Sequence, residues 1–291
     1  MMVKIPRTVH FVFGLKEQIE AFHLVHYLAI ESCRQVLQPD RILLHYHHLP
    51  FGVYWDLIRP HIELRHVDPV EAVNRVNYKP EEVPEGYRYA HHADVIRLDA
   101  LLEHGGVYAD IDTLFLKPFP DTLFHHEFVI GREQPALNPR TKQHEASLCN
   151  ALMMARPGAR LVAAWREQII SALDGSWSQH SCQLAQRLVE QHPDWAHVEP
   201  EPSFLGVPLS PDGLDAFLSE SSPHGALDLS QSYSVHLWQH VWWDAERTDF
   251  TRASSRDLTL AAMRQGKSQF ARLAKPFLPE LDSYTLDGLV A

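Results

Sequence analysis

Two aspartates, Asp110 and Asp112, are the residues of this 291-residue sequence best suited to chemistry. They end an apolar run, Val107 to Ile111, that we predict to be a β-strand. Side chains two apart in an extended chain point to the same side, so both carboxylates could bind one cation. Oxygen ligands suit Mg²⁺ or Mn²⁺, which can neutralise a diphosphate and stabilise charge on a leaving phosphate. The alternative is a simple turn after a strand, because Asp-x-Asp tripeptides are common.

A second pair of charged residues, Asp94 and Arg97, lies on a predicted helix from Ala90 to His104. Residues three apart share one helix face, so these two side chains can meet. Taken alone they could form only a surface ion pair. Their position just upstream of the aspartates makes a shared site the more specific hypothesis.

The elements around these residues alternate between strand and helix, which predicts an α/β fold with a largely parallel sheet. A Gly105-Gly106 pair ends the helix that carries Asp94. We expect a long exposed loop from Glu133 to Ser147, because this stretch contains two prolines and scattered charges. The predicted strands are Thr8 to Phe13, Arg41 to Tyr46, Glu63 to Val67, Val107 to Ile111, Leu148 to Ala155 and Tyr233 to Trp238.

Composition narrows the class of partner and the location. The formal net charge is −11 and there is no Lys/Arg-rich block, so we expect no nucleic-acid partner. Three widely spaced cysteines indicate a reducing compartment, and no apolar run is long enough to span a bilayer. We therefore expect a cytoplasmic protein. A peripheral contact with the inner face of a membrane, through the segment Phe270 to Leu278, is a further hypothesis.

The segment Ala90 to Thr113, AHHADVIRLDALLEHGGVYADIDT, resembles the signature of DXD-motif glycosyltransferases of glycosyltransferase family 32. That group includes yeast mannosyltransferases, animal galactosyltransferases and, more distantly, the large clostridial glucosylating toxins. Three further stretches resemble the family's first strand, a later strand with its asparagine and the closing histidine motif: IPRTVHFVFG, LCNALMMARPG and SVHLW. The likeness spans about residues 5 to 240.

This resemblance implies a GT-A type nucleotide-sugar-binding fold, with a mostly parallel central sheet flanked by helices. Residues 1–245 would form the glycosyltransferase domain, and residues 246–291 a C-terminal extension packed on or near it. The implied activity is transfer of a hexose from a nucleotide-diphosphate sugar, a UDP-sugar being favoured, with retention of configuration. The cofactor would be Mn²⁺ or Mg²⁺. The acceptor would be a glycan, a lipid-linked molecule or a protein, as in polysaccharide biosynthesis.

The resemblance also assigns roles to the charged residues. Asp112 would be the principal metal ligand, and Asp110 would bind the metal directly or through water and reach the ribose. His236 would supply a later metal ligand. Asp94 and Arg97 would contact hydroxyls of the donor sugar.

Further residues are implied to bind the donor. Asn150 would contact the transferred sugar, and Phe13 and Tyr108 would border the uridine. Phe13 replaces the family's usual tryptophan, which reduces the area for base stacking. Ala93 replaces a frequent serine, which puts one hydroxyl contact to the nucleotide in doubt. Trp238, near Trp242 and Trp243 in the sequence, is either a core residue or part of a donor-binding surface.

Two other functions and one other site are possible from the same residues. In a phosphatase of the haloacid dehalogenase type, Asp110 would be the nucleophile, although that motif normally opens the domain and here more than a hundred residues precede it. A catalytically inactive nucleotide-sugar-binding protein is the second alternative. His45, His47 and His48 could form a zinc site, but solvated histidines on a strand are more common.

Overall fold

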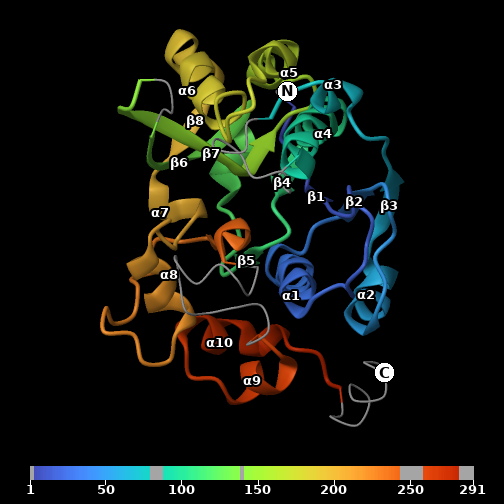
Figure 1. Cartoon of the computed structure of the whole chain (residues 1–291), viewed down its shortest axis with the longest axis vertical. Coiled ribbons are helices and arrows are strands. Elements are labelled where there is room, and N and C mark those ends of the chain that lie inside the picture. Colours follow the sequence, from blue (N-terminus) through green and yellow to red (C-terminus); the bar gives the residue numbers. More distant parts are fainter. Residues whose placement is uncertain (1–2, 79–87, 138–140, 243–257, 282–291) are drawn as a thin grey trace.

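A mixed seven-stranded sheet forms the centre of the chain (Figure 1). The computed structural model describes residues 3–78, 88–137, 141–242 and 258–281. The strands of this sheet, in their spatial order, are β3 (Glu63–His66), β2 (Arg41–Tyr46), β1 (Thr8–Val12), β4 (Gly106–Ala109), β7 (His144–Ala155), β6 (Phe128–Leu137) and β8 (His197–Glu199).

The sheet is mostly parallel. β1 pairs in parallel with β2 and β4, β2 with β3, and β6 with β8. In this sheet β7 alone runs antiparallel to its neighbours β4 and β6. A second, two-stranded sheet joins β5 (Thr113–Phe115) to β9 (Ser234–His236) in antiparallel pairing. The expected α/β architecture, a mostly parallel central sheet flanked by helices, is confirmed.

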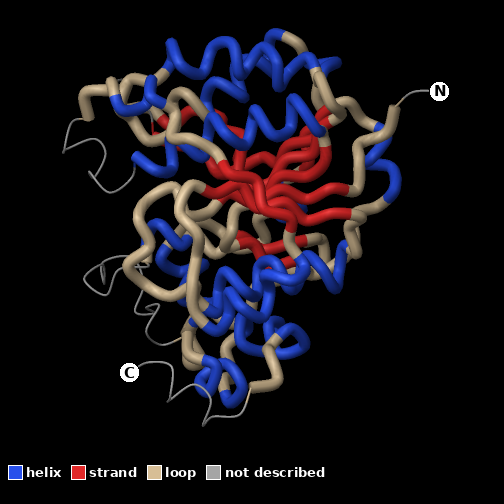
Figure 2. Tube along the Cα trace, turned by 90° about the vertical axis from the view of Figure 1, so that its right-hand side faces the viewer, coloured by secondary structure: helices blue, strands red, loops and turns tan. Residues whose placement is uncertain are grey.

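Helices cover both faces of the central sheet, and Figure 2 shows the strands lying between an upper and a lower group of helices. The face that packs against α4, α5 and α6 is opposite the face that packs against α1, α2 and α8. The α-helices are α1 (Leu24–Ser32), α2 (Val53–Ile58), α3 (Glu71–Asn74), α4 (Arg88–His104), α5 (Arg160–Ala172), α6 (Cys182–Gln191), α7 (Glu201–Phe204), α8 (Pro211–Leu218), α9 (Leu260–Gln265) and α10 (Gln269–Ala274).

Alternation along β1 explains how one strand serves two cores. All five of its residues are buried, as expected for a strand covered on both faces. Val9 and Phe11 pack into the cluster that includes α1 and α8, and Val12 packs into the cluster that includes α4 and α5. The sheet therefore holds its polar strand ends between two rigid hydrophobic layers.

The described part of the C-terminal segment packs against the rest of the chain. α10 contacts α8, and the side chains of Phe270 and Phe277 are buried in the same hydrophobic cluster as β1. These two rings are therefore not available as a membrane surface. The predicted domain boundary at residues 245 and 246 lies outside the described residues, so the division into two parts stays a prediction.

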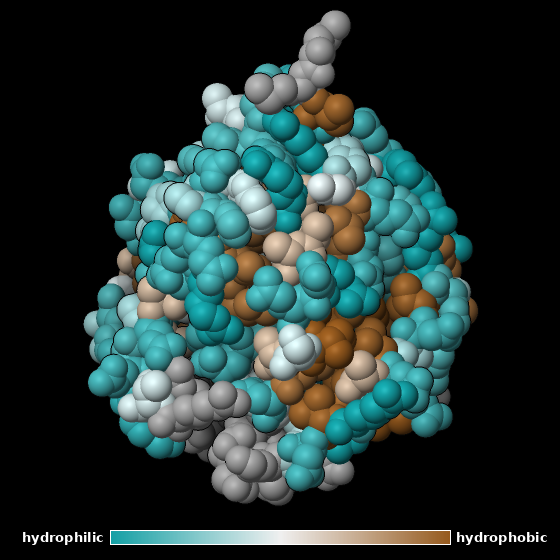
Figure 3. Space-filling model, turned by 90° about the horizontal axis from the view of Figure 1, so that it is seen from above, coloured by the Kyte–Doolittle hydropathy of each residue, from teal (hydrophilic) through white to brown (hydrophobic). Residues whose placement is uncertain are grey.

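One face of the described surface is mainly polar. Figure 3 shows one face on which hydrophilic residues predominate and hydrophobic residues gather near the centre. Within the described ranges, no helix combines the length and the apolar character that crossing a bilayer requires.

The structure corrects two of the predicted elements. The stretch from Glu133 to Ser147 is not a long loop, because β6 extends to Leu137 and β7 begins at His144. Pro135 is tolerated because the register shifts between Glu133 and Ala136, which leaves it outside the regular ladder. The late strand β9 is also shorter than expected and belongs to the small sheet.

Gly106, the first residue of β4, should be essential for stability. Its φ is +103°, and a Cβ placed there would lie 2.3 Å from the Thr8 carbonyl oxygen. We expect Gly106→Ala to lower the free energy of unfolding by roughly 3 kcal/mol, through backbone strain and overpacking together. Gly158 is a matched control, since its φ is +70° but a Cβ would meet nothing within 4 Å.

Urea denaturation of both variants measures this difference. Gly158→Ala should cost only about 1 kcal/mol, the strain of a left-handed backbone. Equal losses in the two variants would contradict the role given to the close approach of β4 and β1.

Candidate functional site

Asp110 and Asp112 lie in the turn that joins β4 to β5. The Asp110 amide donates to the Ala151 carbonyl on β7 at 2.7 Å, and the Thr113 amide closes the turn on the Asp110 carbonyl at 3.1 Å. The two aspartates are therefore not in an extended strand, as predicted, but in a turn just after one. Their carboxylates still converge, because the turn brings both to the carboxyl-end edge of the parallel strands.

His236 on β9 completes this group. β9 pairs with β5 so that His236 lies opposite Thr113, the residue after Asp112. The His236 Nε2 atom is 3.0 Å from Asp112 Oδ1 and 3.7 Å from Asp110 Oδ2. Candidate ligand atoms of the three residues all lie within 4.8 Å of one another. The structure thus brings together the three residues predicted to hold a metal.

Each aspartate is anchored through one oxygen and turns the other toward the shared point. The Tyr108 hydroxyl donates to Asp110 Oδ1 at 2.6 Å, which leaves Oδ2 facing His236. The Gln239 amide donates to Asp112 Oδ2 at 2.8 Å, which leaves Oδ1 facing His236. Such anchoring fixes the direction of a ligand before an ion binds.

Burial and charge shift the pKa values of these groups. Burial would raise the pKa of Asp112, but His236 and the Gln239 amide outweigh it and lower that pKa to about 2. Burial raises the pKa of Asp110, with the nearby Asp112 charge acting in the same direction. Burial opposes a charged His236, but Asp112 and Asp110 outweigh it and raise the pKa of that imidazole. Together, Asp110, Asp112 and His236 favour one positive charge at this point, either a proton on the imidazole or a bound cation.

The same three residues fit a divalent cation. Ligands at about 2.1 Å from a six-coordinate ion and at right angles lie about 3 Å apart. The separation of His236 Nε2 from Asp112 Oδ1 is of this size. The Asp110 side chain is 27% exposed, against 7% for Asp112, so the group opens to solvent at Asp110. Oxygen ligands with one imidazole suit Mn²⁺ or Mg²⁺.

The guanidinium of Arg97 joins this group to a second polar cluster. Its Nη2 atom is 3.3 Å from Asp110 Oδ1 and 3.3 Å from Asp94 Oδ1. Its Nη1 donates to the Asn150 carbonyl at 2.8 Å, and its carbon lies 4.5 Å from the centre of the Tyr108 ring. Both carboxylates keep Arg97 charged although its side chain is only 6% exposed.

Asp94 is the centre of the second cluster. The Asn150 side-chain amide donates to Asp94 Oδ1 at 2.6 Å, and His180 Nε2 lies 2.9 Å from Asp94 Oδ2. Burial would raise the pKa of Asp94, but Arg97 and His180 outweigh it and lower that pKa. Asp94, Arg97 and Asn150, predicted to bind the donor sugar, are thus one connected network.

One interpretation of these residues is wrong. Asp94 and Arg97 do not form a surface ion pair, because both side chains are less than a tenth exposed. His236 is buried as well, and its imidazole faces two carboxylates.

The three aromatic residues predicted at the donor site have different surroundings. The Phe13 ring, which is half-buried, packs edge-on to Phe22 and lies 4.7 Å from the His26 ring. Tyr108 is 1% exposed and lies beneath Arg97, so it offers no free ring face. Trp238 is 5% exposed and donates its indole N–H to the Val207 carbonyl.

The three histidines of the possible zinc site do not meet at one point. His45 is buried and its Nε2 lies 3.0 Å from His10 Nδ1. His47 instead lies near His66 and Asp68, with candidate ligand atoms within 4.8 Å of one another. The His47 Nδ1 atom is 3.0 Å from the Val67 carbonyl oxygen. Both His66 and Asp68 are exposed.

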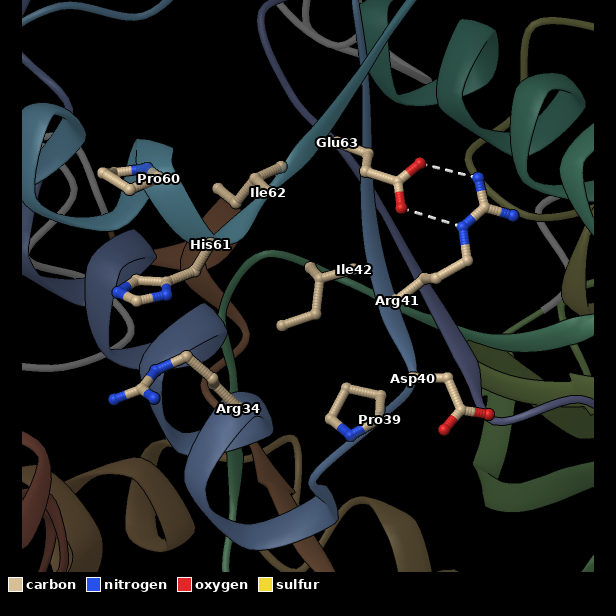
Figure 4. A pocket seen from close by; sticks show the side chains of 9 residues that line it. All are labelled: Arg34, Pro39, Asp40, Arg41, Ile42, Pro60, His61, Ile62 and Glu63. Carbon is tan, nitrogen blue, oxygen red and sulfur yellow. Dashed lines mark hydrogen bonds and ion pairs between the residues drawn. The ribbon is translucent and has the colours of Figure 1, made fainter.

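A cavity of about 340 Å³ lies where β2 and β3 begin (Figure 4). The aspartates instead follow the end of β4, at the opposite edge of the sheet. The cavity is lined by residues at the starts of β2 and β3, including Arg41 and Glu63, which form a bidentate ion pair. None of the predicted site residues lines this cavity. In parallel sheets ligands bind at the carboxyl ends of the strands. We therefore place the candidate site at Asp110 and not in this cavity.

Sequence reasoning missed residues that the fold brings to the site. His180, in the segment between α5 and α6, contacts Asp94 across 86 positions in the sequence. Gln239 binds Asp112 with its backbone and lies near His26 on α1 with its side chain. A histidine in a polar segment carries no local signal of its partner, so the sequence around His180 could not have revealed its contact with Asp94. For Gln239, its position next to SVHLW could have suggested a role.

Comparison with known proteins identifies the class. Residues 66–129 match the family model described as a glycosyltransferase sugar-binding region containing a DXD motif. The match covers α4, β4, β5 and both aspartates, whereas Asn150 and His236 lie outside it. The resemblance to DXD-motif glycosyltransferases is therefore confirmed, and with it the prediction of a glycosyltransferase.

The individual proteins that the chain resembles in sequence are distant relatives. The chain is 29% identical over 286 residues to glucan organizing enzyme 1 of Cryptococcus neoformans, covering 97% of this chain and 73% of that protein. It is 27% identical over 107 residues to subversion of eukaryotic traffic protein A of Legionella pneumophila, covering 37% of this chain and 15% of that protein.

Solved structures similar to this one include two glycosyltransferases. The PaToxG glycosyltransferase has a TM-score of 0.41 at 15% identity, with 65% of this chain and 71% of that chain covered. The galactosyltransferase LgtC, in complex with donor and acceptor sugar analogues, has a TM-score of 0.43 at 12% identity, with 97% and 100% covered.

Arg97 should be a major determinant of stability. Lysine keeps the charge but cannot reach two carboxylates and a carbonyl with one planar fork. We expect Arg97→Lys to lower the free energy of unfolding by about 3 kcal/mol, because buried carboxylates lose their partner. Arg75→Lys is the control, since Arg75 pairs with Glu71 on the surface and should change stability by less than ~0.5 kcal/mol.

Chemical denaturation of the two variants tests this. A loss below about 1 kcal/mol for Arg97→Lys would contradict a structural role for the guanidinium.

Proposed function

We propose that this chain is a metal-dependent, retaining glycosyltransferase that moves a hexose from a UDP-sugar to an acceptor. One observation carries the proposal. A group suited to a divalent cation, Asp110, Asp112 and His236, is joined by Arg97 to the polar network of Asp94 and Asn150. A nucleotide-diphosphate sugar has the same two parts, an anionic diphosphate and a hydroxyl-rich ring, joined by the bond that must break.

Asp110, Asp112 and His236 would hold the cation, which supplies neutralisation of the diphosphate and of the charge on the leaving phosphate. Asp112 and His236 are the more buried ligands, and Asp110 lies on the open side. Tyr108 then has a positioning role: its hydroxyl fixes Asp110, in place of the predicted contact with the uridine.

Asp94 and Asn150 would bind hydroxyls of the hexose. A hydrogen bond with His180 and an ion pair with Arg97 fix the orientation of the Asp94 carboxylate before a sugar arrives. Such fixed groups hold a substrate with little ordering cost. The half-buried ring of Phe13, which packs beside the buried His26 on α1, offers a surface on which a uracil could stack. Trp238 supports the site from below, because its ring lies 4.3 Å from that of His236.

The acceptor is proposed to be a saccharide chain. The support is the name of a relative that aligns with nearly the whole chain, glucan organizing enzyme 1. A lipid-linked sugar or a glycosylated protein would present the same kind of hydroxyl to the site.

A panel of nucleotide sugars tests the proposal. The protein is incubated with Mn²⁺ and each of UDP-glucose, UDP-galactose, UDP-N-acetylglucosamine and GDP-mannose, and release of the nucleotide is measured. Nucleotide release from one donor supports the proposal. Release of phosphate from a phosphate monoester, with none from the donors, would favour the phosphatase that uses Asp110 as nucleophile. Binding of a donor without turnover would favour an inactive binding protein.

Asp112→Asn should abolish the metal-dependent turnover with little change in the shape of the side chain. The substitution keeps the size of a buried side chain and an oxygen for the Gln239 amide. Turnover should fall at least ~100-fold, because changing even the neighbours of metal ligands costs 10- to 100-fold. The thermal stabilisation by Mn²⁺ should disappear. Asp121→Asn, at an exposed residue, is the control and should behave like wild type.

Loss of turnover is also expected when metal is removed from the unmodified chain. EDTA should stop nucleotide release, and added Mn²⁺ should restore it. Full turnover in EDTA would exclude a metal-dependent reaction.

His236→Ala should raise the Mn²⁺ concentration needed for half-maximal activity about tenfold or more. In the wild-type protein the pKa of His236 is raised by Asp112, so the imidazole gains a proton as the pH falls and then competes with the cation. Apparent Mn²⁺ affinity should therefore decrease toward acidic pH. His61→Ala, at the distant cavity, is the control. An unchanged Mn²⁺ requirement in His236→Ala would remove this residue from the metal site.

A further inference from the structure

A group of three metal-ligand candidates, His47, His66 and Asp68, lies outside the proposed donor site. One candidate ligand atom from each residue lies within 4.8 Å of those of the other two. His47 directly follows β2, His66 ends β3, and Asp68 lies two residues beyond β3. The two strands are neighbours at one edge of the central sheet, as Figure 1 shows, so the group joins two separate parts of the chain.

Parallel pairing between β2 and β3 brings these side chains together. The register sets Tyr46 opposite His66, and the Val67 amide donates to the Tyr46 carbonyl at 2.8 Å, which continues the pairing beyond β3. The centroids of the His47 and His66 rings lie 5.2 Å apart. Asp68 follows His66 by two positions, the spacing at which side chains of an extended segment share one side.

The hydrogen bonding of His47 prepares one of its nitrogens for a metal. Its Nδ1 atom is 3.0 Å from the Val67 carbonyl oxygen, and because a carbonyl only accepts, Nδ1 carries the proton. Nε2 then keeps the lone pair with which a neutral imidazole binds a metal. Histidine ligands commonly donate their other ring N–H to a backbone carbonyl in this way, which fixes the orientation of the ring. His47 is therefore oriented as a ligand before an ion arrives.

The other two residues have no competing polar partner within the described ranges. Both His66 and Asp68 are exposed, and neither side chain forms a hydrogen bond or an ion pair with another described residue. Their ligand atoms can therefore turn toward His47 without breaking an existing interaction. Their exposure also leaves room for water to complete the coordination of an ion.

The ligand types distinguish this group from the one formed by Asp110, Asp112 and His236. Two imidazoles and one carboxylate form a nitrogen-rich set, which suits Zn²⁺. Two carboxylates and one imidazole are richer in oxygen, which suits Mn²⁺ or Mg²⁺. Three protein ligands with water in the fourth position occur at tetrahedral Zn²⁺ sites.

We propose that His47, His66 and Asp68 bind Zn²⁺ at a second metal site, separate from the proposed donor site. The proposal is carried by the closeness of the three ligand atoms and by the hydrogen bond that orients His47. It does not depend on the proposed glycosyltransferase function. The ion connects the end of β2 to the segment that follows β3, which is an edge strand of the central sheet.

The bound ion also stabilises the segment that leads from β3 toward α4. Two residues after Asp68, the Val70 amide donates to His92 Nδ1 at 2.9 Å. His92 belongs to α4, the helix that carries Asp94 and Arg97. Zinc therefore supports the contact between the sheet edge and this helix and takes no part in the proposed reaction.

Equilibrium dialysis against Zn²⁺ tests the site. Zinc binding is compared between Asp112→Asn, which lacks a ligand of the first metal group, and the same chain with His66→Gln added. The second substitution should weaken the binding of one zinc ion at least ~10-fold, because even outer partners of metal ligands contribute that much. Asp68→Asn, which keeps the size of the side chain, should also weaken it. His61→Gln, at another exposed histidine, is the control and should leave zinc binding unchanged.

Thermal unfolding provides a second measurement on the same chains. At a free Zn²⁺ concentration ~100 times the Kd, Asp112→Asn should melt roughly 4 °C higher than it does without zinc. His66→Gln should remove this shift, yet change the melting temperature without zinc by no more than about 1 °C, because it alters an exposed side chain.

Zinc binding that is the same with and without His66→Gln would overturn the proposal. Absence of a tightly bound zinc ion from Asp112→Asn would overturn it as well. The proposed function fails on a different result, the absence of nucleotide release from every donor of the panel. If that function holds, nucleotide release with Mn²⁺ should be the same in His66→Gln as in wild type, and a loss would contradict the separation of the two metal sites.

Discussion

The buried guanidinium of Arg97 is the interaction on which the rest of the site depends. It neutralises one carboxylate from each half of the site, Asp94 and Asp110, and covers the Tyr108 ring. Without it, the buried Asp94 carboxylate and the partly exposed Asp110 carboxylate would both lose a cationic partner, and an unpaired charge is far more costly in a buried position than at the surface. Arg97 is carried by α4, which packs against β1, β4 and β7 of the central sheet. One helix therefore sets the distance between the place suited to the diphosphate and the place suited to the sugar.

The site also depends on β9, a strand late in the sequence that supplies its third metal-ligand candidate. β9 pairs with β5, and this pairing places His236 against the aspartates. Trp238 has a positive φ of 53°, which turns the chain so that the next amide, that of Gln239, reaches Asp112. A non-glycine residue in this conformation is strained, and strain of this kind is common where a backbone group serves a site. The small two-stranded sheet thus positions His236, because its three residue pairs hold this imidazole against the aspartates.

The sequence predicted the site residues that lie close together in the chain better than those that lie far apart in it. Asp94, Arg97, Asp110 and Asp112 lie within one helix, one strand and one turn, so periodicity and spacing are enough to bring them together. Glu133 was placed in an exposed loop because prolines hide the strand pattern around it, and only the paired hairpin reveals where it lies. His180 contacts Asp94 from 86 positions away, and no spacing rule relates two such residues. The burial of the charged pairs could not be predicted either, since burial depends on which elements pack above them.

The separation between the aspartates and their last partner has a consequence for synthesis of the protein. Gln239 follows Asp112 by 127 positions, and His236 is almost as far away. A chain leaving the ribosome folds from its beginning, so β1, β2 and β4 can pair long before β9 emerges. During that interval the turn with Asp110 and Asp112 lacks both its imidazole and its backbone donor. A cation site formed by Asp110, Asp112 and His236 would therefore be complete only after β9 has been made.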